Sequence, residues 1–226
     1  MAKFGKIITE NSEKKLIKKF NTLFIQKIRK NKKKRFSLVL AGGKGPINLY
    51  KNLSNNKKIN WKKIDFFISD ERYVNELSSN SNIRMCKKNL LEKIKATNKQ
   101  IYKVSTDKHT VKKSVADYEK KIKKYFNKKK ISFDLILLGV GNDGHVASLF
   151  KNNINKKTNK NVISIKKKGF LRISLTLKCL VKSKNIFLWV PNKNKSDIIE
   201  KILLDNKNKY PASFLKKKNN FLFHCN

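Results

Sequence analysis

FDLILLGV (residues 133–140) is a mostly apolar run of strand length that ends beside glycines, and similar runs recur along the chain. Short apolar runs bounded by turn residues are typical of strands buried on both faces of a parallel sheet. Two such runs precede it, FSLVLAGG (36–43) and IDFFIS (64–69), and a shorter one is QIYKV (100–104). The sequence therefore predicts four buried strands before residue 141.

Segments with helical spacing of apolar residues separate these runs. The first covers residues 9–28, where Leu16, Phe20, Phe24 and Ile28 fall on one face. Further helices are predicted at 47–53, 81–94, 109–126 and 195–205, and a helical turn is predicted from about Asp143. The last third of the chain adds predicted strands at 161–165, 171–177, 185–190 and 220–224.

This alternation predicts an α/β fold: a mostly parallel, Rossmann-like sheet with helices on both faces, plus a strand-rich C-terminal part. The 226 residues contain no internal repeat and no linker rich in Pro, Gly or Ser, so we expect one domain over 1–226. The three cysteines show no Cys-x-x-Cys spacing, which favours a reducing compartment. Without a signal peptide or a run of about 20 apolar residues, we expect a cytoplasmic protein with no membrane partner.

The formal net charge of +41 raises the question of a nucleic-acid partner. The positive charge is almost all lysine, spread from end to end and accompanied by abundant Asn and Ile. Arginine, which base readout and bidentate phosphate recognition favour, occurs only five times, at 29, 35, 72, 84 and 172. We therefore interpret the lysines as solvated faces under compositional bias, and we do not expect nucleic-acid binding. The field would still attract a small anionic substrate.

Unusual polar motifs follow three of the predicted strands: AGGKGP (41–46), SDERYV (69–74) and GVGNDGH (139–145). Ligands of open parallel sheets bind outside the carboxyl ends of the strands, so we expect a site there. AGGKGP is either an ordinary turn or a loop whose backbone N–H groups approach an anion closely. SDERYV is either a surface ion-pair cluster or a site where Arg72 faces an anionic or carbonyl oxygen while a carboxylate orients it.

His145 is either a satisfied structural histidine or a general base, since a free imidazole titrates near ~6.5. In the second case Asp143 would hold the ring, and the glycine-rich backbone and a helix N-terminus would offer donors to a developing oxyanion. Arg172 and Lys195 are each placed to reach a phosphate. Ser148 lacks a nucleophile-elbow motif, and the other histidines, at 109 and 224, form no ligand cluster, so we expect no metal site.

Taken in order, these motifs resemble those of the 6-phosphogluconolactonase family, within the superfamily that also contains glucosamine-6-phosphate deaminases. The resemblance runs from about residue 8 to the C-terminus. It includes AGGKGPINLY (41–50), DERYV (70–74) with Ser81-Asn82, GVGNDGHVASLF (139–150), RISLT (172–176), Lys195 and Pro-Ala-Ser at 211–213. Arg72 and the segment ASLF favour the lactonase branch, because the deaminases typically have tyrosine and Asn-Glu-Pro at those places.

The resemblance implies hydrolysis of 6-phospho-D-glucono-1,5-lactone in the oxidative pentose phosphate pathway, without metal or organic cofactor. It implies that His145 is the general base, that Asp143 orients it, and that Arg72 lies near the carbonyl or its developing charge. It places Gly42, Gly43, Arg172 and Lys195 where the superfamily holds the sugar phosphate. We also expect Lys44 and Asp70 to bind the substrate or its phosphate. The expected partner is a small sugar phosphate, and the expected state is a monomer or weak dimer.

Two other functions stay open at this point: an enzyme of the glucosamine-6-phosphate deaminase/isomerase type, and a non-catalytic basic binding protein on the same fold. The chain also departs from the family pattern. Ala41, Lys44 and Gly45 stand where Ser, Ser and Thr are usual, Asn75 follows DERYV in place of Pro, and Asn192 replaces a glycine. The absent hydroxyl groups raise the hypothesis that the charge of Lys44 replaces their hydrogen bonds.

Overall fold

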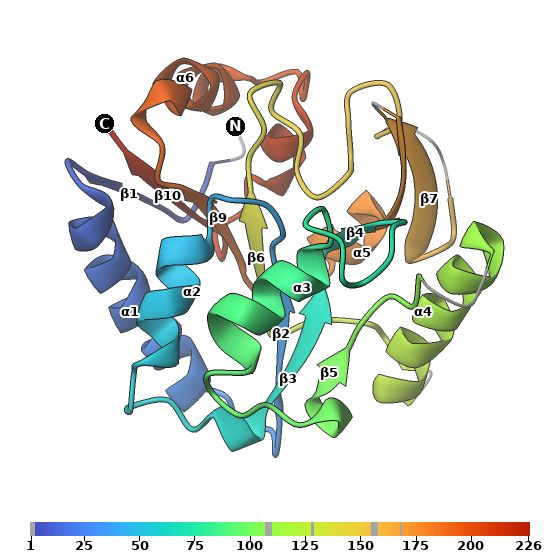
Figure 1. Cartoon of the computed structure of the whole chain (residues 1–226). Coiled ribbons are helices and arrows are strands. Elements are labelled where there is room, and N and C mark those ends of the chain that lie inside the picture. Colours follow the sequence, from blue (N-terminus) through green and yellow to red (C-terminus); the bar gives the residue numbers. More distant parts are fainter. Residues whose placement is uncertain (1–2, 107–109, 128, 155–157, 168) are drawn as a thin grey trace.

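A parallel sheet of seven strands forms the centre of the computed structural model (Figure 1), in the order β1-β10-β9-β6-β2-β3-β5. The structure describes residues 3–106, 110–127, 129–154, 158–167 and 169–226. Every neighbouring pair of strands in this sheet is parallel. The strands are β1 (Lys6–Glu10), β2 (Phe36–Leu40), β3 (Ile64–Ile68), β5 (Ile101–Tyr102), β6 (Leu135–Gly139), β9 (Ile186–Val190) and β10 (Phe221–Cys225).

Alternate residues of the central strands face two separate hydrophobic cores, as the period of a strand requires. On β6, Leu135 and Leu137 face one core, whereas Ile136 and Leu138 face the other. The first core is covered by α1 (Glu13–Arg29), α2 (Ile47–Ser54) and α3 (Asn82–Cys86), the second by α4 (Val111–Tyr125), α5 (Leu177–Val181) and α6 (Ser196–Leu204). The prediction of a mostly parallel sheet with helices on both faces is therefore confirmed (Figure 1).

A second, antiparallel sheet contains three strands in the order β4-β8-β7. They are β4 (Asp70–Arg72), β8 (Phe170–Leu175) and β7 (Val162–Lys167). The strand-rich C-terminal part thus divides, because β7 and β8 build the small sheet while β9 and β10 join the large one. Strand β4 was not predicted, and its register with β8 places Asp70 opposite Ser174 and Arg72 opposite Arg172.

Several boundaries differ from the predictions. Residues 6–10 form strand β1, and the first helix begins only at Glu13, after Ser12, whose side chain accepts a hydrogen bond from the backbone N–H of Lys15. The helix expected over 81–94 is α3 followed by a wider π-helical turn, η2 (Lys87–Leu91). Helix α5 lies between the strands predicted at 171–177 and 185–190, where no helix was predicted. His109, expected to begin a helix, lies outside the described residues. The short 3-10 turns are η1 (Trp61–Lys63), η3 (Asn98–Gln100), η4 (Lys193–Lys195) and η5 (Pro211–Leu215).

The order of the strands creates a crevice between β2 and β6. Within this sheet, the strand that follows β2 in sequence is β3 on one side. The strand that follows β6 is β9 on the other side, after the chain has passed through β7 and β8 of the small sheet. Connections that leave two adjacent strands in opposite directions open a space at their carboxyl ends, where ligands of such sheets bind. The motifs at 41–46 and 140–145 follow β2 and β6 and so meet at this point.

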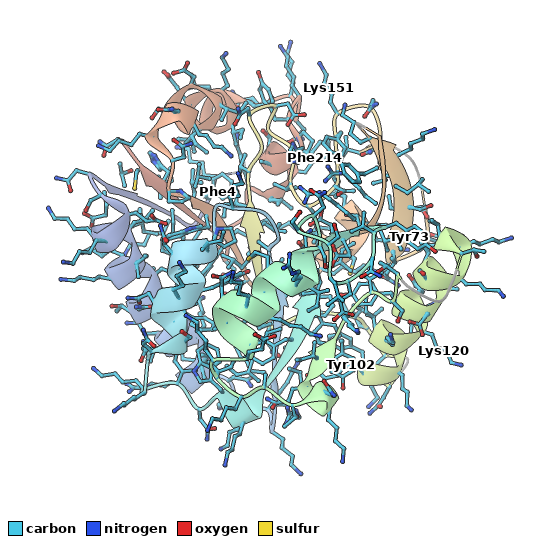
Figure 2. All side chains as sticks on the ribbon, in the orientation of Figure 1. Phe4, Tyr73, Tyr102, Lys120, Lys151 and Phe214 are labelled. Atoms are coloured by element: carbon cyan, nitrogen blue, oxygen red, sulfur yellow. The ribbon has the colours of Figure 1, made fainter. Side chains whose placement is uncertain are left out.

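The lysine side chains are distributed around the molecule rather than gathered in one place. Figure 2 shows nitrogen-tipped side chains projecting all around the outline, Lys120 and Lys151 among them. Across the ranges that the structure describes, no helix combines the length and the apolar composition needed to cross a lipid bilayer.

Phe20 gives a direct test of how the first core is packed. Its ring is 1% exposed and contacts Phe187 and Trp189 edge-on, with centroid separations of 5.5 Å to each. Phe20→Ala is expected to lower the free energy of unfolding by about 3 to 5 kcal/mol, because it leaves a cavity against β9. Lys19→Ala, at the exposed neighbouring position, should change it by less than about 0.5 kcal/mol. Chemical denaturation of the variants measures both, and equal losses would contradict this packing.

Candidate active site

The crevice holds a pocket of about 550 Å³ lined by segments from all three motifs. The loop after β2, the strand β4, the loop after β6 and the segment after β9 each contribute to its wall. Eight of the nine predicted site residues line it: Gly42, Gly43, Lys44, Asp70, Arg72, His145, Arg172 and Lys195. The ninth, Asp143, reaches the pocket through its contact with His145. The site is therefore assembled from segments that lie far apart in the sequence.

His145 is held in one orientation by its neighbours. Its Nδ1 atom hydrogen-bonds to Oδ1 of Asp143, which also accepts the backbone N–H of His145 at 3.3 Å. Burial raises the pKa of Asp143, but the hydrogen bond and charge of His145 lower it more, and the net pKa lies below the ordinary value. The imidazole lies over Gly141, where a Cβ would be 2.0 Å from Nδ1, so only glycine fits there. The hydrogen bond to Asp143 uses Nδ1 of His145 and leaves the other ring nitrogen, Nε2, for a ligand.

The segment that carries His145 is irregular, and the predicted helical turn from Asp143 is wrong. Gly144 has a φ of +75° and donates its N–H to the carbonyl of Gly141 at 2.9 Å, while Gly141 donates to the carbonyl of His145, also at 2.9 Å. These bonds turn the chain back on itself and use two of the glycine N–H groups. The expected helix N-terminus is therefore absent at His145, and these two amides are not free to stabilise an oxyanion.

A second turn follows directly and is strained. The N–H of Leu149 donates to the carbonyl of Val146 at 2.9 Å, and Ala147, at its corner, has a φ of +49°. For a residue with a Cβ this left-handed conformation costs about 1 to 2 kcal/mol. Ser148 offsets the cost, since its Oγ donates to Oδ2 of Asp70 at 2.7 Å, and a hydrogen bond to a charged group contributes about 1.5 to 3 kcal/mol.

Asp70 directs its carboxylate into the protein. It is 7% exposed, and its other oxygen, Oδ1, accepts the hydroxyl of Ser69 at 2.9 Å. The backbone N–H of Ser148 in turn donates to Oγ of Ser174, the residue opposite Asp70 on β8. Asp70 therefore lies at the pocket wall with both carboxylate oxygens engaged by protein hydroxyls.

Arg72 and Arg172 lie opposite each other on β4 and β8 and present two cations to the same wall. Nη1 of Arg72 donates to the carbonyl of Asn80 at 2.8 Å, so a backbone oxygen holds this guanidinium where a carboxylate was expected. Burial lowers the pKa of Arg172; Asp70 opposes that shift, and the nearby charge of Arg72 adds to it. Nε of Arg172 is buried and has no hydrogen-bond partner among the described residues.

Lys195 reaches the pocket from the opposite side. Its Nζ donates to the carbonyl of Val140, immediately before Gly141. Burial lowers the pKa of Lys195, while Asp143 acts in the opposite direction. The pocket therefore has partly desolvated cations on two sides of His145, an arrangement suited to an anionic ligand.

The loop 41–46 is held in place by contacts from residues of α2, α3 and β9. Gly42 lies against Asn82, where a Cβ would be 2.1 Å from Cγ, and the N–H of Gly43 donates to Oδ1 of Asn82 at 3.3 Å. The hydroxyl of Tyr50 donates to the carbonyl of Ala41 at 2.8 Å, and Nε1 of Trp189 donates to the carbonyl of Gly45 at 3.2 Å. Gly43 has a φ of +80°, which favours glycine. The loop is thus pre-formed before any ligand binds.

Sequence reasoning assigned no role to Asn82 or Glu71, although both organise the site. Besides its contact with Gly43, Asn82 donates through Nδ2 to the carbonyl of Asp70 at 2.8 Å, which joins two of the motif loops. The Glu71 carboxylate accepts the backbone N–H groups of Asn82 and Ile83 at 2.7 and 2.8 Å and so caps helix α3. The pair Ser81-Asn82 after DERYV was the available signal. No group of three or more His, Cys, Asp or Glu suited to a metal ion occurs in the part of the chain that the structure describes.

Comparisons with known proteins show to which family the chain is similar. A family model described as glucosamine-6-phosphate isomerases/6-phosphogluconolactonase matches residues 11–223. The chain is 34% identical over 197 residues to a 6-phosphogluconolactonase of Thermotoga maritima, which covers 86% of this chain and 85% of that protein. It is 29% identical over 195 residues to a 6-phosphogluconolactonase of a Nostoc species, which covers 84% of this chain and 81% of that protein.

Solved structures show the same fold. The crystal structure of 6-phosphogluconolactonase from Thermotoga maritima superimposes with a TM-score of 0.83 at 28% identity, covering 97% of this chain and 99% of that one. That of the 6-phosphogluconolactonase from Trypanosoma cruzi gives a TM-score of 0.86 at 24% identity, covering 100% and 96%. The second likeness supports the fold alone.

Glu71 provides a pH-dependent test of how the site is built. Burial raises its pKa to about 7, although the N–H groups of Asn82, Ile83 and Arg72 lower it. The folded protein therefore retains a proton that the unfolded chain releases near its ordinary pKa of about 4.3. The resulting stabilisation is complete below that value and is lost as the pH rises through about 7.

We expect Glu71→Gln, which carries no titrating proton, to show a smaller fall in Tm between about pH 5 and about pH 8 than the wild type. Glu76→Gln is the matched control, since Glu76 pairs with surface lysines and its pKa is lowered below that range. An unchanged pH dependence in Glu71→Gln would contradict the raised pKa.

Proposed function

The chain belongs to the glucosamine-6-phosphate isomerase/6-phosphogluconolactonase family, and we propose that it hydrolyses 6-phospho-D-glucono-1,5-lactone to 6-phospho-D-gluconate. This reaction is the lactone-opening step of the oxidative pentose phosphate pathway. The observation that carries the assignment of residues is the His145–Asp143 pair in a pocket whose walls present Arg72, Arg172 and Lys195. A general base beside a cluster of cations suits attack of water on the carbonyl of an anionic ester.

In the proposed mechanism, His145 takes a proton from a water molecule as its oxygen attacks C1 of the lactone. Asp143, bonded to Nδ1, holds the ring so that Nε2 acts as the base, and it stabilises the imidazolium that forms. The negative charge that develops on the carbonyl oxygen is stabilised by Arg72. When the bond between C1 and the ring oxygen breaks, the imidazolium returns the proton to that oxygen, and the new carboxylic acid ionises into solvent.

The phosphate is assigned to the other cationic groups of the pocket. Arg172 offers a planar set of donors, and Lys195 and Lys44 offer point charges. Gly43 leaves the backbone of this loop open to a ligand, since a Cβ there would meet no atom within 4 Å. Asp70, predicted as a substrate-binding residue, has its carboxylate engaged by Ser69 and Ser148, so its proposed role moves to support of the site.

His145→Ala tests the assignment of the base. The variant should fold normally, since the side chain is 31% exposed, and should lose about 10²- to 10⁴-fold of the acceleration above spontaneous hydrolysis. The lactone is generated in place with glucose-6-phosphate dehydrogenase and its disappearance is followed at neutral pH and low salt. His224→Ala, at a histidine that bonds to Thr9, is the control and should retain activity.

Full activity of His145→Ala would remove the base assignment. If the wild-type protein gave no acceleration but released ammonia from glucosamine 6-phosphate, the isomerase branch of the family would replace the proposal. If the protein catalysed neither lactone hydrolysis nor ammonia release but bound DNA in a salt-dependent way, a binding protein would be supported instead.

Lys44→Ala tests the altered loop. Lys44 is exposed at the pocket and stands where the family has a hydroxyl residue. If its charge replaces the missing hydrogen bonds, the variant should raise KM for the lactone about tenfold, the equivalent of about 1.4 kcal/mol, and leave kcat within about twofold. Lys51→Ala, exposed on α2 outside the pocket, should leave both unchanged. An unchanged KM in Lys44→Ala would refute the compensation.

A further inference from the structure

We propose that Asp70 and Ser148 act together as positioning residues for His145, by fixing the turn Val146–Leu149 that follows it. The inference rests on the proposed function for its kinetic consequence, but the physical link stands on the geometry. The hydrogen bond between Ser148 and Asp70 joins the loop that carries His145 to the strands β4 and β8, which carry the two arginines. Neither residue needs to touch the substrate for this role.

The turn does not hold its shape through backbone preference. Ala147 adopts a φ of +49° at the corner, although it lines the pocket and has a Cβ. Val146 and Leu149 on either side are 0% and 1% exposed, so their side chains anchor the two ends in the second core. Between these two residues, Ser148 fixes the turn with two hydrogen bonds. Its Oγ donates to the carboxylate of Asp70, and its backbone N–H donates to Oγ of Ser174.

The position of the turn determines that of His145. Val146, whose carbonyl closes the turn, directly follows His145, whose own carbonyl accepts the N–H of Gly141. A shift of the turn therefore changes the direction in which the chain leaves the imidazole. Because Asp70 lies on β4 two residues from Arg72, the contact with Ser148 also sets the base relative to the cations across the pocket.

The charge of Asp70 fits this role better than contact with substrate. A carboxylate beside a bound phosphate would repel it, yet both oxygens here accept hydroxyl groups and the side chain is nearly buried. Asp70 also raises the pKa of the partly buried Arg172, against the effect of burial. Asp70 therefore supports the pocket wall through its hydrogen bonds to protein groups.

Ser148→Ala removes the hydroxyl and keeps the carboxylate. Since small displacements of a catalytic group lower the rate by up to about 10²-fold, we expect kcat to fall about 10- to 100-fold and KM to change by less than about threefold. Ser114→Ala is the matched control, because Ser114 is fully buried on α4 and its Oγ has no partner within the described ranges. It should leave kcat and KM within about twofold.

A second variant separates positioning from general loss of stability. Glycine adopts the left-handed conformation without a Cβ penalty, so Ala147→Gly added to Ser148→Ala should restore kcat at least about threefold. The amide of Leu149, followed by hydrogen exchange in NMR, should exchange faster in Ser148→Ala than in the wild type and should not change in Ser114→Ala. That exchange measurement does not depend on activity.

Three results would overturn the proposal: an unchanged kcat in Ser148→Ala, equal kinetic losses in Ser148→Ala and Ser114→Ala, or unchanged exchange at Leu149. If the wild-type protein does not hydrolyse the lactone, the proposed function fails by itself, and the exchange rates still decide whether Asp70 and Ser148 fix the turn.

Discussion

The pairing of β2 with β6 is the constraint on which the rest of the molecule depends. Only two residue pairs, Leu38 with Leu135 and Val39 with Ile136, define the register of these strands. A reciprocal side-chain link extends it, since Ser37 donates its N–H and its hydroxyl to Asp134, and the N–H of Asp134 donates back to Oγ of Ser37. Because the next strand of the sheet after β2 is β3 on one side and the next after β6 is β9 on the other, a crevice opens at the carboxyl ends of this pair.

Glycine allows backbone and side chains to meet closely in that crevice. The imidazole of His145 packs against the backbone of Gly141, and the side chain of Asn82 packs against Gly42. At both glycines a Cβ would overlap the neighbouring side-chain atoms. Both contacts fix the orientation of a polar side chain: the imidazole of His145 in one case and the bridging amide of Asn82 in the other. The glycines after β2 and β6 therefore serve the packing of side chains inside the site.

The central strands were predictable because burial on both faces makes them continuous apolar runs, as at 36–40 and 135–139. Strand β4 was not, because Asp70, Glu71 and Arg72 are polar and pair with β8, about a hundred residues later in the chain. The contact between His145 and Asp143, by contrast, was predictable because the two residues are close in the sequence. The juxtaposition of Arg72 with Arg172 depends on that long-range pairing. The inward carboxylate of Asp70 and the bridge through Asn82 depend on other contacts between distant segments, and local periodicity encodes none of these. The predicted helix at His145 failed because a left-handed Gly144 and the bond from Gly141 turn the chain back.

The two populations of cations in this chain differ in what they contribute to binding. Lysines project into solvent around the molecule (Figure 2), where water and salt screen each charge and a contact with an anion contributes little. Arg172 and Lys195 are partly buried, and burial lowers the pKa of each, which means that their charged forms have lost hydration in the folded protein. An anion in the pocket replaces that lost hydration and interacts through a medium of lower polarity than water. A cation of the pocket is therefore able to interact with an anion more strongly than a lysine on the open surface.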